Sequence, residues 1–199
     1  MKNFVQYKTP FFKALLMSSV LFSVSLCTCN ENNKGIQKVL ETHKQVKNSH
    51  SIRDNEIYFL SKATEISLEA VKLGELAQQS SYLSDVKDLG KRMEQAHAKY
   101  LDDLALLARK QLIILPSNVT NESQAIYNKL RQTPRRQFDK AYCDRVVSNH
   151  KEAIGVFENT LIKKEIALEI QQWSTIILAE LRIHLVYAMI AQRKSEKIK

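Results

Sequence analysis

The chain has 199 residues, with 30 Lys and Arg against 21 Asp and Glu, which gives a formal net charge of +9. This length suits one domain of ordinary size, with or without a targeting segment. Only 4 Gly and 3 Pro are present, which excludes collagen-like and low-complexity classes and disfavours a turn-rich β-sandwich or barrel. Hydrophobic residues make up 44%, enough for a packed core, and 3 Cys cannot form a disulfide scaffold.

Residues 1–28 are typical of a bacterial lipoprotein-type signal peptide. They hold no acidic residue, start with a basic segment and continue into an apolar run, residues 14–26, which is too short to span a membrane. Leu26 and Thr28 lie three and one positions before Cys29, the arrangement that precedes an acylated cysteine. We therefore predict lipid attachment at Cys29 and an exported protein, periplasmic or anchored in the outer membrane. Whether Cys27 or Cys29 marks the cleavage site stays open. The alternatives are an ordinary cleaved signal with two incidental cysteines, and an uncleaved membrane anchor.

Residues 29–53 are polar, rich in Asn, Lys and His, and show little sustained periodicity. This composition predicts a flexible tether between the membrane and a domain that comprises residues 54–199, with a short helix near residues 36–46.

From residue 54 onward, apolar residues recur every three or four positions, which is the period of an amphipathic helix. The predicted long helices cover residues 54–80, 84–115, 133–163 and 165–193, and a short helix covers residues 123–131. Ser84 is a plausible N-cap of the second helix, and Pro134 suits the first turn of the helix that follows Thr133. Four long helices with such stripes predict an all-α fold, an antiparallel four-helix bundle.

Three glycines fall inside the predicted helices, at Gly74, Gly90 and Gly155. A glycine in a helix interior costs about 1 kcal/mol relative to alanine. We therefore expect these positions to be sites of close helix approach.

Three histidines, His97, His150 and His184, fall on the inward stripes of three different helices. Counted from the helix ends, His150 and His184 differ in height by about six residues, or roughly 9 Å, and the long middle connection leaves the two helix pairs unaligned. If the pairs are in register, all three histidines lie near the middle of the bundle. Imidazole binds zinc, copper and iron, so these residues, with Glu94 and Glu69 as carboxylate ligands, are candidates for a metal site.

The spacing of Glu94 and His97 is the E-x-x-H pattern of di-iron bundles, which need two such motifs. Val147 and Leu181 stand three positions before the other two histidines, so a ferritin-type di-iron centre is not expected. The competing interpretation is a buried polar layer. Tyr100 and Tyr187 each follow a histidine by three residues, and hydrogen-bonded His and Tyr side chains can fix helix register.

No catalytic motif is present: the sequence has no glycine-rich phosphate loop, no C-x-x-C and no G-x-S-x-G. Cys143 precedes His150 by two helical turns, about 10 Å, which is too far for direct activation of a nucleophile. We assign no catalytic residue, and we expect the protein not to be an enzyme.

Together these residues resemble a known family, the ferritin-like "domain of unknown function 4142" of bacterial exported and lipid-anchored proteins. The resemblance covers about residues 55–192 and is carried by short motifs in order: Phe59-Leu60, Leu73-Gly74, Val86-Lys87, Met93 with His97, Leu115-Pro116, Phe138-Asp139, His150-Lys151-Glu152-Ala153 and Leu181-Arg182 with His184. It implies a ferritin-like fold, export and no established activity. The chain departs from the family where an acidic residue often precedes the histidines, at Ala96 and Asn149, and at Ala70 in place of a glutamate.

The function expected first is therefore a cell-envelope lipoprotein, a non-enzymatic helical bundle that acts as a structural or interaction module. Its partners would be the membrane, through the lipid anchor, and an envelope protein of unknown identity. No basic stripe with interleaved aromatic residues is present, so a nucleic-acid partner is not expected. The alternative is a bundle that binds one transition-metal ion, zinc, copper or iron, through its inward histidines.

Overall fold

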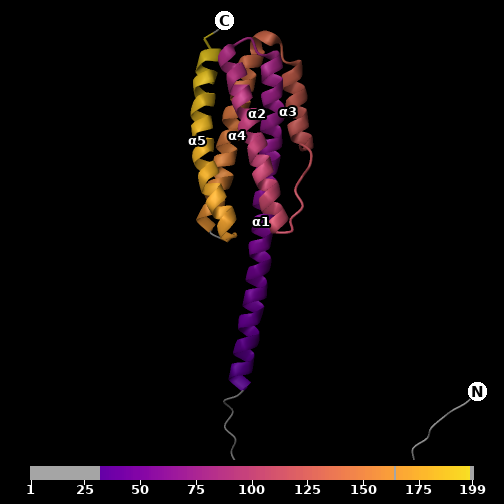
Figure 1. Cartoon of the computed structure of the whole chain (residues 1–199), viewed down its shortest axis with the longest axis vertical. Coiled ribbons are helices and arrows are strands. Elements are labelled where there is room, and N and C mark those ends of the chain that lie inside the picture. Colours follow the sequence, from indigo (N-terminus) through magenta and orange to yellow (C-terminus); the bar gives the residue numbers. More distant parts are fainter. Residues whose placement is uncertain (1–31, 164, 198–199) are drawn as a thin grey trace, which may run out of the picture. The chain divides into compact units, whose positions relative to one another are not determined.

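The computed structural model describes residues 32–163 and 165–197, and the chain divides into two compact units, residues 1–41 and 42–199. The predicted signal segment and Cys29 lie outside the described residues. Within them every regular element is a helix: α1 (Asn32–Ser80), α2 (Ser84–Lys110), α3 (Asn121–Gln132), α4 (Arg135–Lys163) and α5 (Leu168–Ser195) (Figure 1). The predicted all-α fold class is confirmed.

The first helix begins earlier than the sequence pattern indicates. α1 starts at Asn32, so residues 32–53, which we predicted to form most of a flexible tether, are helical. This segment holds no proline and one glycine, Gly35, so little in it ends a helix. Residues 49–54 are exposed. At these residues the polar composition therefore reflects exposure and does not predict the conformation.

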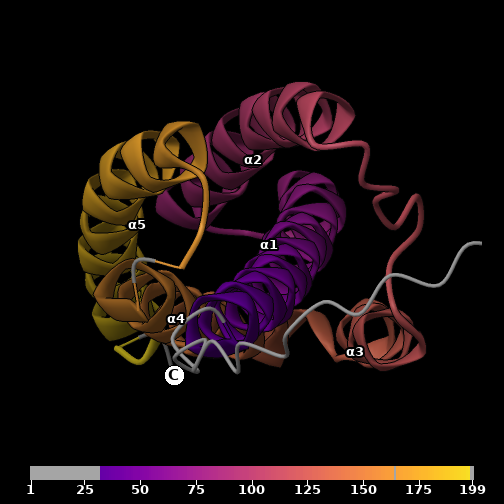
Figure 2. The same cartoon turned by 90° about the horizontal axis from the view of Figure 1, so that it is seen from below.

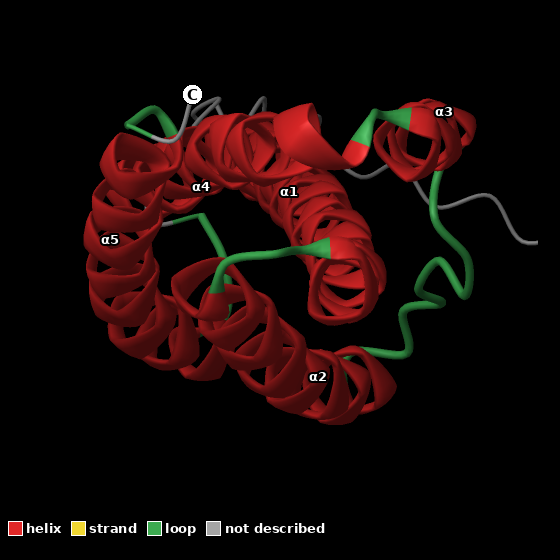
Figure 3. Ribbon diagram, turned by 90° about the horizontal axis from the view of Figure 1, so that it is seen from above, coloured by secondary structure: helices red, strands yellow, loops and turns green. Residues whose placement is uncertain are grey.

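In the second unit α1, α2, α4 and α5 lie side by side, and the short α3 lies outside them, beside α1 and α4 (Figures 2 and 3). Each long helix runs antiparallel to its neighbours, because residue numbers rise along one helix as they fall along the next. The pairs that show this are Lys62 with Glu152 and Glu69 with Arg145 between α1 and α4, and Asp85 with Lys194 and Tyr100 with Glu180 between α2 and α5.

The predicted inward stripes form the core. Two of the residues predicted on these stripes, Leu161 and Ala167, are partly buried at the α4–α5 end. All the others are buried: Phe59, Ala63, Ile66, Ala70, Leu73 and Ala77 on α1, Val86, Gly90, Met93, His97, Tyr100, Leu104 and Leu107 on α2, Cys143, Val146, His150, Ala153 and Phe157 on α4, and Ile170, Ser174, Ile177, Leu181, His184, Ala188 and Ala191 on α5. The buried apolar residues separate into two clusters, one around Phe59, Tyr100 and Leu181 and the other around Leu73, Met93 and Ala188. On α2, α4 and α5 alike, the residue between the two clusters is a histidine. The core is thus interrupted by one polar level.

The second long helix, α2, differs from the prediction in its last residue and in its N-cap. α2 ends at Lys110, five residues early, where Leu112 adopts a positive φ of 54°. The N-cap of α2 is Leu83, which makes no side-chain capping bond, so Ser84 is the first helical residue and not the cap. The connection to α4 then runs through α3, whose cap Thr120 accepts a hydrogen bond from the Ser123 amide at 3.1 Å.

Two of the three helical glycines mark a close approach, between α1 and α2. A Cβ added at Gly74 would lie 2.6 Å from the Gly90 carbonyl oxygen, and one added at Gly90 would lie 2.8 Å from the Gly74 oxygen. A Cβ at Gly155 would meet nothing within 4 Å, so the expectation of close packing there was wrong.

α5 carries apolar residues on both of its faces. By length and composition it could cross a membrane, with a mean hydropathy of 1.5, and 39% of that window is buried inside the protein. Its inner face supplies Ile170, Ile177 and Leu181 to the core. The core helix of a folded domain often has this length and composition.

Candidate metal centre

Three imidazoles meet at the polar level of the core. His97 from α2 and His150 from α4 are each 1% exposed, and His184 from α5 is 7% exposed. Their ring centroids lie 5.5 Å (His97–His150), 5.7 Å (His150–His184) and 6.1 Å (His97–His184) apart. One ring nitrogen of each lies within 4.8 Å of those of the other two. The helix pairs are therefore in register at this level.

Two of the rings are oriented by their second nitrogen. His150 Nδ1 lies 2.9 Å from the Val146 carbonyl oxygen, one turn earlier on α4, so this nitrogen carries the proton and donates it. His97 Nδ1 lies 3.2 Å from the Ser67 hydroxyl of α1. A ligating histidine ordinarily uses its other nitrogen in this way, which fixes the ring and its tautomer.

The remaining ring nitrogens have no partner. His97 Nε2, His150 Nε2 and His184 Nδ1 are buried and make no hydrogen bond among the described residues. In His150 the unpartnered Nε2 carries a lone pair, since the proton is on Nδ1. Each buried polar atom without a partner costs about 1–3 kcal/mol, and such atoms are rare in native proteins. Of the six such side-chain atoms among the described residues, three belong to the histidines at this level, and the other three lie on α4.

The tyrosines expected to pair with the histidines do not hydrogen-bond to them. The Tyr100 ring lies against His97 and His184, with centroids 5.0 and 6.3 Å away, but its hydroxyl donates to Glu180 at 2.5 Å. Tyr187 is 42% exposed and stacks under the Arg92 guanidinium. Among the described residues the polar-layer interpretation therefore lacks the hydrogen bonds on which it depends.

The electrostatic environment keeps the three imidazoles neutral. Burial lowers the pKa of His97 well below its ordinary 6.5, and repulsion from His150 and His184 lowers it further. Burial also lowers the pKa of His150 to about 4, against the opposing effect of its hydrogen bond to Val146. The pKa of His184 is lowered to about 4 by burial and then by the charge of Arg92. Neutral imidazole is the form that binds a metal ion.

Neither candidate carboxylate joins the imidazoles. Glu69 is buried but accepts hydrogen bonds from Arg145 at 2.6 Å, from Asn149 at 3.3 Å and from the Ser123 hydroxyl. It stands one residue from the inward Ala70, a rotation of about 100° around the helix, which turns it toward α3 and α4. Glu94 accepts a hydrogen bond from Gln78 at 2.5 Å.

Among the described residues, the group is therefore made of imidazoles alone. The two residues that orient it, Ser67 and Val146, were not predicted from the sequence. Val146 had a local signal, because a histidine side chain in a helix can reach the carbonyl four residues earlier. Ser67 had none, since it lies 30 residues from His97 and acts across two helices.

Residues 41–189 match the family described as Domain of unknown function (DUF4142). The match covers most of the chain. The protein belongs to this family. No curated protein and no solved structure matches the chain.

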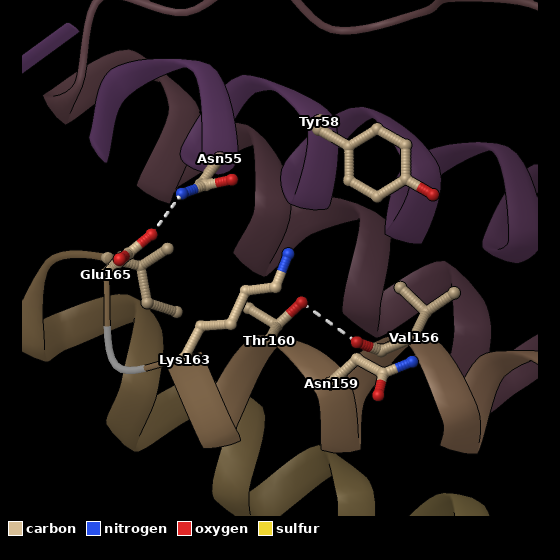
Figure 4. Close-up of a pocket in the computed structure, with 8 residues that line it drawn as sticks. Asn55, Tyr58, Val156, Asn159, Thr160, Lys163 and Glu165 are labelled. Atoms are coloured by element: carbon tan, nitrogen blue, oxygen red, sulfur yellow. Dashed lines mark hydrogen bonds between the residues drawn. The ribbon is translucent and has the colours of Figure 1, made fainter. Parts of the chain in front are cut away.

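A hollow elsewhere in the DUF4142 domain is lined by both polar and apolar residues and holds none of the three histidines. It has a volume of about 480 Å³ and lies between α1 and the α4–α5 junction. In Figure 4 the Asn55 side chain donates a hydrogen bond to Glu165 at 2.8 Å, and the Thr160 hydroxyl donates to the Val156 carbonyl. Three of its polar side chains, Asn55, Thr160 and Glu165, are therefore engaged with other groups of the protein.

Cys143, also in the DUF4142 domain, is fully buried and unpaired. Burial, and next the charge of Asp139, raises the pKa of its thiol to about 12. A thiol held in this protonated form is a poor nucleophile and a poor metal ligand. Cys143 is a core residue.

Proposed function

We propose that this DUF4142 protein binds one transition-metal ion through His97, His150 and His184, and that it is not an enzyme. The single observation that carries the proposal is the meeting of three buried imidazoles: one ring nitrogen of each lies within 4.8 Å of those of the other two. In addition, each ring has one buried nitrogen without a hydrogen-bond partner among the described residues. Bonds of about 2.0–2.1 Å place tetrahedral ligand atoms about 3.4 Å apart. The ring nitrogens would have to approach one another by up to about 1.4 Å to bind one ion in this way.

We further propose that the domain is a four-helix bundle of the ferritin-like kind. In such bundles, metal sites form in the core from side chains on facing helices. The antiparallel packing of α1, α2, α4 and α5, and the long connection between α2 and α4, support this assignment. The ligand set differs from the carboxylate-rich di-iron type, because the helices contribute histidines and no paired glutamates.

Metal analysis of the full chain purified without chelator tests the metal proposal. We expect about one equivalent of metal in the wild type and in His50→Ala, which removes an exposed histidine outside the core. The variant His97→Ala/His150→Ala is expected to hold none. A metal-free wild type that cannot be reloaded, together with a large loss of stability in the double variant, would instead support the structural polar layer.

The cellular setting is a proposal from sequence alone: an exported cell-envelope lipoprotein held to the membrane through Cys29. The basic, acid-free segment before the apolar run, and Leu26 three positions before Cys29, support it. Cys29→Ser is expected to abolish fatty-acid labelling, whereas Cys27→Ser should retain it. Labelling that persists in Cys29→Ser would refute the assignment.

A second candidate function, an interaction module, is favoured by the outer face of α5. Ile176, Ile183 and Ile190 are exposed at seven-residue spacing, with Val186 between them on the same face. This is the spacing of a coiled-coil seam, so the partner proposed for it is a second copy of the chain. Sedimentation equilibrium should show a dimer that Ile183→Glu dissociates and Ile162→Glu, an exposed residue on α4, does not. A wild-type monomer would exclude it.

A further inference from the structure

We call the layer of the core that holds His97, His150 and His184 the histidine level. The charges around it determine which kind of ion the site suits. The three ligand groups are neutral imidazoles, and no carboxylate or thiolate of the described residues belongs to the group. The nearby glutamates are already engaged: Glu69 by Arg145, Glu94 by Gln78 and Glu180 by the Tyr100 hydroxyl. A cation bound here therefore meets no negative ligand from these residues.

The surroundings also disfavour high positive charge. His97 and His150 are almost fully buried, and the flanking clusters are apolar. Arg92 on α2 places its guanidinium over the ring of Tyr187, one turn along α5 from His184, so a fixed positive charge lies on this side of the group. Because the Born energy grows with the square of the charge, burying a divalent ion costs about four times as much as burying a monovalent ion of the same radius.

The chemical softness of the nearby ligand atoms also favours a monovalent ion. Met93, one turn before His97 on the inward face of α2, is buried and lines a small cavity together with His150. Soft thioether ligands favour monovalent copper, and imidazole also binds copper well. Magnesium, calcium and manganese prefer carboxylate, carbonyl and water oxygens, which this group does not offer.

Resting on the proposed function, we infer that the ion bound by His97, His150 and His184 is monovalent copper, Cu(I). It is the common first-row transition-metal ion with a single positive charge, and three neutral imidazoles leave the whole site with a charge of only +1. A divalent zinc, copper or iron ion would leave +2 in the same buried position.

The test compares the affinities of Cu(I) and Zn²⁺ for one chain. Cysteine thiols also bind Cu(I), so the full chain is used with Cys27→Ser, Cys29→Ser and Cys143→Ala in every arm. Cu(I) is titrated without oxygen against a chromophoric Cu(I) chelator, and Zn²⁺ against a zinc dye. We expect one Cu(I) per chain, bound at least about a hundredfold more tightly than Zn²⁺, and no displacement by tenfold excess zinc.

Two variants separate this inference from the proposed function. His97→Ala/His150→Ala should lose the Cu(I) site, and His50→Ala should keep it. If Zn²⁺ binds more tightly than Cu(I) and is lost in the double variant, the metal site stands and the assignment to Cu(I) is overturned. If neither ion binds to the parent chain, the proposed function itself fails. If Cu(I) remains bound in the double variant, the ligands are other residues and the inference is overturned.

Discussion

The carboxylate of Glu69 shows how one residue can be polar, buried and still unavailable to a metal. It is 4% exposed and held by the guanidinium of Arg145, whose side chain is 22% exposed. A buried charge is tolerated only when it is paired and hydrogen-bonded. The role of Glu69 is therefore to join α1 to α4 and to the N-terminal turn of α3.

Removing the partner of Glu69 should destabilise the domain. Arg145→Met leaves the carboxylate buried without its counter-charge, which we expect to lower the free energy of unfolding by about 2–3 kcal/mol in urea denaturation. Lys110→Met removes an exposed ion pair with Glu169 and should change little, because such pairs contribute little. An Arg145→Met chain as stable as the wild type would show that Glu69 is solvated.

The helical glycines give a second prediction at the residue scale. Replacing glycine by alanine should change the stability of the domain in opposite directions at two positions, Gly155 and Gly90. Gly155→Ala adds a methyl group into open space and removes the helix penalty of glycine, so it should stabilise the domain by up to about 1 kcal/mol. Gly90→Ala drives a Cβ to 2.8 Å from the Gly74 oxygen and should destabilise it. Thermal unfolding of the two variants measures both. Equal effects would mean that α1 and α2 are not in close contact here.

At the scale of helices, the apolar period predicted which faces turn inward, and nearly all of the predicted stripe residues are buried. This succeeded because burial of one face is what makes a surface helix stable. The start of α1 was missed because the polar segment 32–53 lacks strong helix breakers and carries no apolar stripe.

The site was predicted only in part, for a geometric reason. The helical period alone was enough to predict that His97, His150 and His184 lie on inward faces. Their common height depends on the connection through α3, residues 111–134, and on helix ends, which sequence places within a few residues. Glu69 and Glu94 were predicted as ligands because their positions along the helices lie close to the height of the histidines. The angle around the helix, which one residue changes by about 100°, turns them elsewhere.

The histidine level that joins α2, α4 and α5 should make the metal-free protein sensitive to acid. The unfolded imidazoles titrate near 6.5, whereas the folded His150 and His184 have a pKa of about 4. The unfolded state therefore binds more protons between these values, and stability is full above about pH 6.5 and falls as the pH drops toward 4.

The loss is about 1.4 kcal/mol per pH unit for each histidine that is charged only when unfolded. Urea denaturation of the metal-free wild type at pH 7 and pH 5 measures it. His150→Gln should show a smaller difference between the two pH values, and His50→Ala should behave like the wild type. The reverse sign, greater stability at pH 5, would mean that the imidazoles are charged in the folded protein.

For the molecule as a whole, the histidine level is where three helices, α2, α4 and α5, meet between the two apolar clusters of the core. An ion bound there ties α2, α4 and α5 together, and it binds the folded chain in preference to the unfolded one. At a free-ion concentration of 100 times the dissociation constant, this stabilises the fold by about 2.7 kcal/mol. In a protein of this size that corresponds to a rise in Tm of about 5–10 °C.

Differential scanning calorimetry with and without added Cu(I), under anaerobic conditions, measures this rise. It should be absent in His97→Ala/His150→Ala and retained in Ile183→Glu, since the outer face of α5 makes no contribution to the site. Because the chain contributes ligands from three helices, loss of one imidazole should remove most of the gain and not a third of it. A rise that survives the double variant would place the ion elsewhere on the chain and leave the three unpartnered nitrogens unexplained.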